Sequence, residues 1–349
     1  MRPPVFRGGG HPFRANSRTS SRWGHPVEGL EWVGNGRPST VPAGPRLWVP
    51  QGAPATGEHR GTASAVKRGD GGEKVIEIGG RTLIIGERIN PTGRKALAEE
   101  LREEKLDTVI ADARAQAEAG AEVIDVNVGA PGVEESRLLP KAARAVYEET
   151  GLPVCVDSSD AEALKAALAA LPGEDTLVNS VTGDEEVMEI LLPAVAESGA
   201  FVVGLTKDRS GIPRTVEERM AIGLRILEGA ERYGIGKERI LLDFLTMPAA
   251  TDAEAAQVTL SCIEKAFREW GVGTVLGVSN ISFGMPERRV INAAFLAMAV
   301  ARGLAAALVN PLEEGVVQAI LAADMLVGRD PMGRRFLADY RRRKARGSS

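Results

Sequence analysis

The sequence predicts a (β/α)8 barrel of the TIM-barrel class, preceded by a disordered N-terminal extension. Between residues 82 and 328, short β-branched runs alternate with longer helical patterns eight times. This stretch is close to the roughly 250 residues that are typical of such barrels. A doubly wound open sheet is the alternative, but it normally carries a glycine-rich turn after its first strand, whereas here Gly86 is followed by charged residues. The barrel is therefore the favoured interpretation.

The first 72 residues differ from the rest of the chain in composition. They contain 14 Gly and 9 Pro and show no sustained apolar period of 2 or 3.6 residues. Such a segment cannot bury enough apolar surface to offset the entropy lost on ordering. We expect residues 1–72 to be a disordered or spurious extension without a role in the activity. A flexible basic arm that contacts a partner is the alternative.

The alternation places a strand at the start of each of eight units. The predicted strands are Leu83–Gly86, Glu122–Val126, Pro153–Val156, Thr176–Val178, Phe201–Leu205, Ile240–Leu242, Thr274–Val278 and Ala306–Val309. Helices fill the intervals, and six of them are followed by a glycine that suits a left-handed C-cap: Gly120, Gly151, Gly199, Gly234, Gly271 and Gly303. The apolar stripe Ala255, Val258, Cys262, Ala266, Trp270 predicts a helix packed on the sheet. Cys262 is thus expected in the core.

Two boundaries complete the predicted organisation. The barrel is expected to span residues 73–330, and residues 331–349 form a basic C-terminal tail. The run Arg341, Arg342, Arg343, Lys344 and Arg346 carries like charges that repel one another, so we expect this tail to be solvated and disordered.

Charge and composition exclude several classes of function. The net charge of −4 divides into +6 for residues 1–72 and −10 for the remainder, which disfavours nucleic-acid binding. The longest apolar run, Ala293–Ala301, is far shorter than the roughly 20 residues of a membrane span. Two cysteines suit a reducing compartment, so we expect a cytoplasmic protein. All three histidines precede residue 72, which excludes histidine-based catalysis or zinc binding by the barrel, and no bound metal is expected.

Polar side chains close nearly every predicted strand. They are Glu87, Asn90, Asp125, Asn127, Asp157, Asn179, Thr206, Lys207, Asp243, Ser279, Asn280 and Asn310. The carboxyl ends of barrel strands form the active-site face, and unpaired buried polar groups cost about 1–3 kcal/mol each, so a polar ligand is predicted there. The alternative is helix capping, which suits Asp157 because Ser158 and Asp160 follow it closely. Asp157, Asn179 and Asp243 would suit the donors and acceptors of a flat nitrogen heterocycle.

Five motifs, taken together, resemble the pterin-binding methyltransferases that act between methyltetrahydrofolate and a corrinoid protein. They are Gly86-Glu87-Arg88-Ile89-Asn90, Ile124-Asp125-Val126-Asn127-Val128-Gly129, Val156-Asp157-Ser158, Val178-Asn179-Ser180 and Gly277-Val278-Ser279-Asn280-Ile281-Ser282-Phe283-Gly284. The resemblance covers residues 82–328, and the folate module of cobalamin-dependent methionine synthase is a more distant relative. Dihydropteroate synthases share this barrel and its pterin pocket.

The resemblance implies a role for each matching residue. Asp157, Asn179 and Asp243 match residues that hydrogen-bond the pterin ring, and Asn280 matches the catalytic amide beside the methyl-bearing nitrogen. Asp125 and Asn127 match residues near that same end of the ring, and Arg288 matches an arginine near the site. Ser279 is the remaining implied binding residue. Some relatives have a glutamine where this chain has Phe283.

The implied substrates are methyltetrahydrofolate or tetrahydrofolate and a corrinoid (cobalamin) carried by a partner, either a corrinoid iron–sulfur protein or an O-demethylase corrinoid protein. A homodimer is the family's usual state. Two alternatives stay open. Dihydropteroate synthase is disfavoured because its Ser-Arg-His cluster is absent from the barrel, where strand eight ends in Val309-Asn310-Pro311-Leu312. A non-catalytic folate-binding subunit of a corrinoid assembly is the other.

Overall fold

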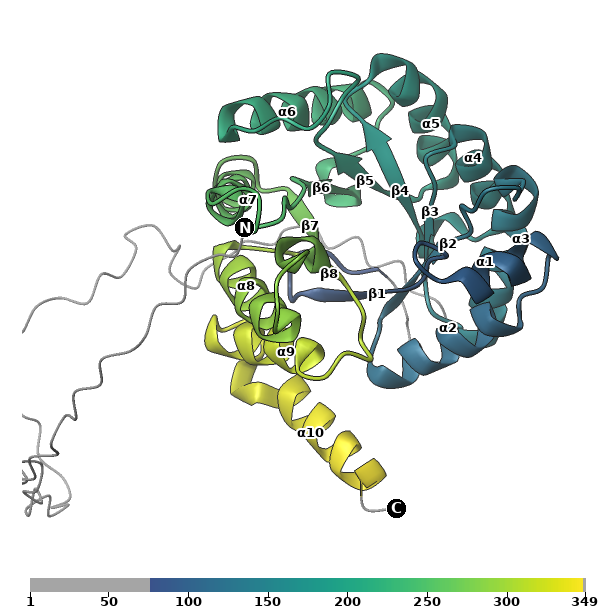
Figure 1. Cartoon of the computed structure of the whole chain (residues 1–349). Helices are drawn as coiled ribbons and strands as arrows, with labels where there is room; N and C mark the ends of the chain where they lie inside the picture. The colour runs from purple at the N-terminus through teal and green to yellow at the C-terminus, as the bar shows by residue number, and fades with distance from the viewer. Residues whose placement is uncertain (1–75, 348–349) are drawn as a thin grey trace, which may run out of the picture. The chain divides into compact units, whose positions relative to one another are not determined.

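A computed structural model of the chain describes residues 76–347, and they form a closed parallel barrel with the strand order β1-β2-β3-β4-β5-β6-β7-β8 (Figure 1). The strands are β1 Leu83–Ile89, β2 Val123–Asn127, β3 Val154–Asp157, β4 Thr176–Thr182, β5 Phe201–Leu205, β6 Ile240–Asp243, β7 Gly273–Gly277 and β8 Ala306–Val309. The predicted barrel is confirmed. The expected disorder of residues 1–72 lies outside the described residues.

Helices surround the ring of strands and connect each strand to the next (Figure 1). They are α1 Lys95–Arg102, α2 Asp107–Ala119, α3 Glu135–Thr150, α4 Ala161–Ala170, α5 Glu185–Ser198, α6 Val216–Arg232, α7 Ala255–Lys265, α8 Arg288–Arg302, α9 Val316–Leu326 and α10 Arg334–Gly347. The predicted glycine C-caps have positive φ, as at Gly303, where φ is 111° and an added Cβ would collide with Phe267. Cys262 of α7 is fully buried, as predicted for a core residue. Among these helices none is long and apolar enough to cross a membrane.

Two apolar layers hold the barrel together. Outside the ring, alternate strand residues pack against the helices. Inside the ring, a second cluster fills the part of the barrel near the amino-terminal ends of the strands. This inner cluster includes Ile85, Val123, Cys155, Leu177 and Val275, and Ile76 and Ile78 join it from the chain that precedes β1. The inner layer forms an apolar floor, so only the carboxyl ends of the strands are left to carry polar side chains inward.

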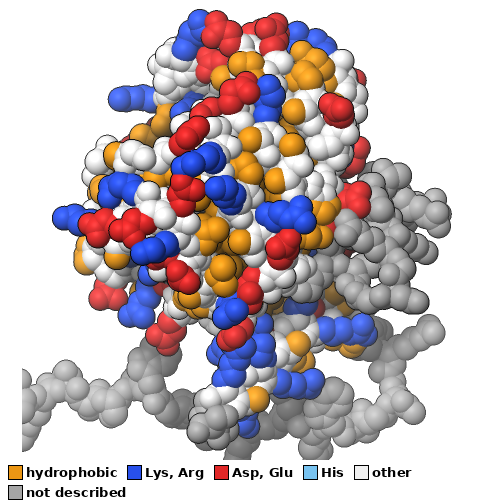
Figure 2. Space-filling model, turned by 90° about the vertical axis from the view of Figure 1, so that its right-hand side faces the viewer, with side chains coloured by type: hydrophobic (Ala, Val, Ile, Leu, Met, Phe, Trp, Pro, Cys, Tyr) orange, Lys and Arg blue, Asp and Glu red, His pale blue; other side chains and the backbone are white. Residues whose placement is uncertain are grey.

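The C-terminal helix corrects one expectation. Residues 334–347 form α10, so the expectation of a disordered tail was wrong for them. The carboxylate of Asp330 accepts hydrogen bonds from the backbone N–H groups of Arg335 and Phe336 at the start of this helix. Buried Asp339 then pairs with Arg342 and Arg343 at 2.6 and 2.7 Å. Acids therefore offset the repulsion within the basic run, although basic side chains still predominate at the lower end of the face in Figure 2.

A buried network ties α9 and α10 to the start of β1. Asp324 of α9 is fully buried and accepts hydrogen bonds from the backbone N–H of Thr82 at 3.0 Å and from its hydroxyl at 2.7 Å. Arg335 of α10 reaches the same carboxylate at 3.0 Å. Because Thr82 precedes β1 directly, the network fastens the last helices to the amino-terminal end of the barrel, opposite the predicted ligand site.

We expect Thr82→Val to lower the free energy of unfolding by about 1–2 kcal/mol, because it leaves a buried carboxylate oxygen without its hydroxyl donor. Thr274→Val is the matched control: Thr274 is also fully buried, but its hydroxyl has no hydrogen-bond partner among the described residues. That substitution should be neutral or slightly stabilising. Urea unfolding of both variants measures the difference, and equal losses would contradict the role of the Thr82 hydroxyl.

Candidate active site

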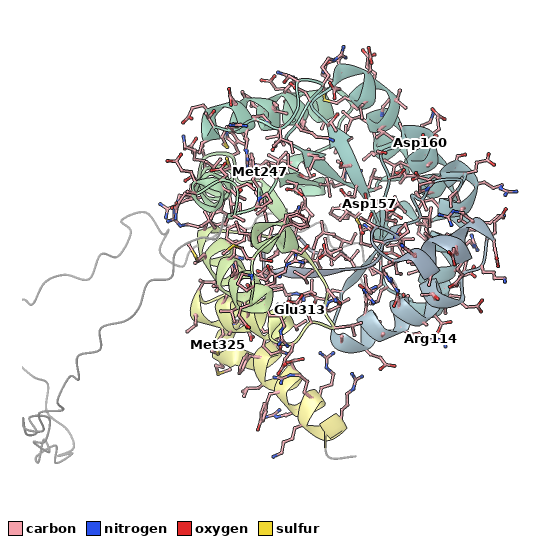
Figure 3. The ribbon with its side chains drawn as sticks, viewed as in Figure 1. Arg114, Asp157, Asp160, Met247, Glu313 and Met325 are labelled. Atoms are coloured by element: carbon pink, nitrogen blue, oxygen red, sulfur yellow. The ribbon has the colours of Figure 1, made fainter. Side chains whose placement is uncertain are left out.

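The polar cluster at the mouth of the barrel follows from the alternation of side chains along the strands. Inward-facing apolar residues of the floor are each followed two positions later by a polar side chain that faces the same way. Ile85 is followed by Glu87, Val123 by Asp125, Cys155 by Asp157, Leu177 by Asn179, and Leu241 by Asp243. Figure 3 shows Asp157 inside the ring of strands and Asp160 outside it, beside α4. Five strands thus direct carboxyl or amide groups into one mouth.

Three polar side chains, two of them from this set and the third Asn127, form a row across β2, β3 and β4. Asn127 is paired in register with Asp157, and Asp157 with Asn179. The amide of Asn127 donates to Asp157 Oδ2 at 3.0 Å, and its own Oδ1 accepts from the backbone N–H of Gly129 at 2.8 Å. Asn127 therefore positions Asp157, and one N–H group and one oxygen lone pair of its amide have no hydrogen-bond partner among the described residues. Asp160 caps α4, because its carboxylate accepts a hydrogen bond from the backbone N–H of Glu162. Helix capping therefore does not explain Asp157.

Asp125 lies one layer deeper than this row and is 2% exposed. Burial, followed by the negative charge of Asp157, raises its pKa well above the usual range. Its Oδ1 has no hydrogen-bond partner among residues 76–347, and its polar neighbours are Cys155 and Asn179. A protonated Asp125 would place an O–H donor and an unsatisfied oxygen beneath any ligand in the mouth.

Asp243 occupies the end of β6. Its Oδ1 accepts from the backbone N–H of Leu245 at 2.7 Å, and burial raises its pKa to about 6. Leu245 has a φ of 56°, an uncommon value for a residue other than glycine, so the chain turns sharply after the carboxylate. Buried Arg219 of α6 braces this turn by donating to the carbonyl oxygens of Phe244 and Leu245. No local pattern in the sequence predicts this contact.

Ser279 and Asn280 lie in a short 3-10 turn, Val278–Ser282, directly after β7. Ser279 donates its hydroxyl to Glu87 Oε1 at 3.2 Å. Asn280 is exposed, and its side-chain amide has no hydrogen bond to any other described residue. Arg288 donates to the Ser279 carbonyl at 2.7 Å and to the Ser282 hydroxyl at 3.0 Å. Arg288 therefore fixes the turn, while the Asn280 amide is left available.

Glu87 also belongs to the site, although its place at the end of a predicted strand led to no predicted binding or catalytic role. Burial, together with the charges of Glu313 and Asp157, raises its pKa to about 7 despite the hydrogen bond from Ser279. It thus joins the β1 side of the mouth to the turn that carries Asn280. The signal that could have placed Glu87 in the mouth is its position two residues after Ile85, which faces the inside of the barrel.

The fold and the polar mouth together define a class of protein. A closed (β/α)8 barrel with converging carboxyl and amide groups at the carboxyl ends of its strands is the architecture of a small-molecule enzyme. Polar groups of this kind suit a ligand rich in N–H donors and nitrogen or oxygen acceptors. No cluster of metal-ligating side chains is found among residues 76–347.

Comparison with known proteins gives the family. A model of pterin-binding enzymes matches residues 86–310, and the chain belongs to this family. The methylcorrinoid:tetrahydrofolate methyltransferase of Eubacterium limosum is 34% identical over 75% of this chain and 97% of its own length. The methionine synthase of Mycobacterium leprae is 35% identical over 65% of this chain, but this match spans only 20% of that protein.

Solved structures with the same fold include dihydropteroate synthases. The enzyme from Xanthomonas albilineans in complex with 7,8-dihydropteroate has a TM-score of 0.53 at 23% identity and covers 71% of this chain and 94% of its own. The Yersinia pestis enzyme has a TM-score of 0.55 at 20% identity over 70% of this chain and 93% of its own. At these identities the likeness concerns the barrel alone.

Proposed function

We propose that this chain transfers a methyl group between methyltetrahydrofolate and the cobalt of a corrinoid held by a partner protein. The observation that carries the proposal is the exposed Asn280 amide, free of other described residues, on the same rim as the carboxyl groups of Asp157 and Asp243. Support also comes from the methyltransferase of Eubacterium limosum, whose length is matched almost completely.

The pterin head is proposed to lie across the mouth against Asp157, Asn179 and Asp243. A carboxylate accepts two N–H groups, and a side-chain amide donates and accepts one hydrogen bond each, which suits an aminopyrimidinone edge. The unsatisfied Oδ1 of Asp125 and the free oxygen of Asp157 lie on the inner side of this position. The donor set of the mouth is therefore compatible with a folate.

Asn280 is proposed to act on the nitrogen that carries the methyl group. That nitrogen is a poor leaving group unless hydrogen bonding or protonation stabilises the charge that develops on it. The Asn280 amide can donate such a hydrogen bond, and Arg288 keeps its turn in place through the Ser279 carbonyl. The corrinoid supplies a nucleophilic cobalt, so this chain contributes orientation and electrostatics rather than a nucleophile of its own.

The partner is proposed to dock on apolar side chains that surround the polar mouth. Phe283 and Met285 lie between the Val278–Ser282 turn and α8, and Leu312 lies between β8 and α9. All three are exposed, Phe283 to 66%. Loops at the carboxyl ends of the strands carry them, so a corrinoid protein that covers the mouth would bury them. A corrinoid iron–sulfur protein and an O-demethylase corrinoid protein both fit this requirement.

The direct test mixes the purified protein with methyltetrahydrofolate and cob(I)alamin and follows the corrin absorbance spectrum. We expect conversion to methylcobalamin and tetrahydrofolate. Binding of methyltetrahydrofolate without any change in the corrin spectrum would instead favour a folate-binding subunit. Condensation of a pterin pyrophosphate with p-aminobenzoate would favour a dihydropteroate synthase.

We expect Asn127→Ala to weaken methyltetrahydrofolate binding about tenfold, although Asn127 itself need not touch the ligand. The substitution removes the 3.0 Å hydrogen bond that orients Asp157, and such a bond to a charged group contributes about 1.5–3 kcal/mol. A double-mutant cycle with Asp157→Asn, measured by calorimetry, tests the coupling. Additive losses from the two substitutions would refute the positioning role of Asn127.

A further inference from the structure

Four carboxyl groups from four parts of the barrel gather on one side of the mouth. Glu87 comes from β1, Asp125 from β2, Asp157 from β3, and Glu313 from the segment between β8 and α9. The charges of Glu313 and Asp157 act on Glu87, and the charge of Glu87 acts on Asp125. Such a cluster cannot be fully ionised in a low-dielectric site, so at least one of its members retains a proton.

Glu87 is the member best placed to use that proton. It is largely buried, its Oε1 lies 3.2 Å from the Ser279 hydroxyl, and Ser279 precedes Asn280 directly. Arg288, on α8, is the cation whose charge acts on Glu87. With burial dominating, the pKa of Glu87 is raised to about 7, which leaves a substantial protonated fraction at neutral pH.

We propose that Glu87 stores the proton that the departing folate nitrogen takes up and passes it on through the Ser279 hydroxyl. The inference rests on the proposed function. When methyltetrahydrofolate reacts, the bond between the methyl carbon and N5 breaks and its electron pair stays on N5. The carbon forms its new bond with the electron pair of the partner's cobalt(I). For this step the Ser279 hydroxyl rotates away from Glu87 Oε1, so that it gives its proton to N5 while its oxygen accepts the proton of protonated Glu87. The resulting Glu87 carboxylate regains a proton from water.

This role differs from that of Asn280. The Asn280 amide can stabilise charge on N5 by a hydrogen bond but cannot release a proton at any accessible pH. Glu87 does not touch the substrate and acts through Ser279, so it is a positioning residue. Its protonation state sets the pH dependence of the reaction. In the direction that forms tetrahydrofolate, the competent form of Glu87 is protonated, so the rate is high below pH 7 and falls as the pH rises through that value.

The test compares the pH–rate profile of the full-length chain with those of Glu87→Gln, Ser279→Ala and a control, using methyltetrahydrofolate and cob(I)alamin. The control is Glu314→Gln, the same chemical change at an exposed glutamate that pairs with Arg289. We expect Glu87→Gln to slow transfer about tenfold at pH 6 and to remove the inflection near pH 7. Ser279→Ala should do the same, while Glu314→Gln keeps the original profile. Folate affinity should change little in Glu87→Gln and Glu314→Gln.

Infrared difference spectra supply a readout that does not depend on turnover. A protonated-carboxyl band that disappears as the pH rises through about 7, and that is missing from Glu87→Gln, is the expected result. If the original protein transfers methyl groups and Glu87→Gln keeps its inflection, the proton relay is wrong while the proposed function stands. If the original protein binds folate but transfers nothing at any pH, the proposed function fails and the relay fails with it.

Discussion

Replacing Asn280 by alanine should slow methyl transfer by about 10²–10³-fold while changing the affinity for methyltetrahydrofolate far less. The amide is exposed and free of other described residues, so its loss leaves the fold and the carboxyl cluster intact. A hydrogen bond to N5 is weak while the nitrogen is neutral and strengthens as the methyl group departs. An interaction that grows in the transition state affects the rate constant more than binding.

Stopped-flow measurement of single turnovers, combined with equilibrium binding of methyltetrahydrofolate, separates the two effects. Gln257→Ala is a suitable control, because it removes an exposed side-chain amide from α7 and should leave both quantities unchanged. Equal losses in rate and affinity for Asn280→Ala would mean that the amide merely holds the substrate.

Replacing Asp243 by asparagine should weaken folate binding and, at the same time, stabilise the folded protein at neutral pH. In the folded state burial raises the pKa of this carboxyl to about 6 from an ordinary value of 3.8. The unfolded chain therefore loses its proton first, and stability falls as the pH rises from about 4 to 6. The penalty amounts to about 3 kcal/mol above pH 6. Asparagine removes the charge and keeps an oxygen for the Leu245 N–H group.

Urea unfolding of the original protein and of Asp243→Asn at several pH values tests whether ionisation of Asp243 lowers the stability of the folded protein. We expect the two to be equally stable near pH 3 and the variant to gain stability up to pH 6, with a constant advantage above it. Calorimetry at pH 8 should show a loss of folate affinity of about tenfold or more. Asp107→Asn, at an exposed position in the first turn of α2, should show no such gain. A variant that is less stable at every pH would contradict the burial penalty.

The barrel could be predicted from the sequence because its signals are local and repeated. Two strands, Phe201–Leu205 and Ala306–Val309, have the predicted bounds, and the glycine C-caps separate the units. Strand β4 continues to Thr182 rather than ending at Val178, because Asn179 and Ser180 are polar yet remain part of the strand. A polar residue at a barrel mouth keeps the strand hydrogen bonds and breaks only the apolar pattern, so apolar runs underestimate strand length.

Site residues could be predicted where the alternation of side chains along a strand and a sequence motif point to the same position. Contacts between elements that are distant in the sequence could not be predicted. Asp157, Asn179 and Asp243 lie inside the mouth, as the strand ends suggested. The hydrogen bond by which Asn127 orients Asp157 depends on the register of β2 and β3. The hydrogen bond from Arg219 joins α6 to the turn after β6. Helix α10 was missed in part for the same reason, because Asp324, which pairs with Arg335, lies on α9. The pairs of Asp339 with Arg342 and Arg343 lie within α10 at i,i+3 and i,i+4 spacing, and they were a local signal for this helix.

A crystal structure with bound methyltetrahydrofolate is the most direct test of the central claim. We predict that the pterin ring contacts Asp157, Asn179 and Asp243 and that its N5 lies within hydrogen-bonding distance of the Asn280 amide. A pterin bound outside the mouth of the barrel, or one whose N5 faces away from Asn280, would contradict the claim.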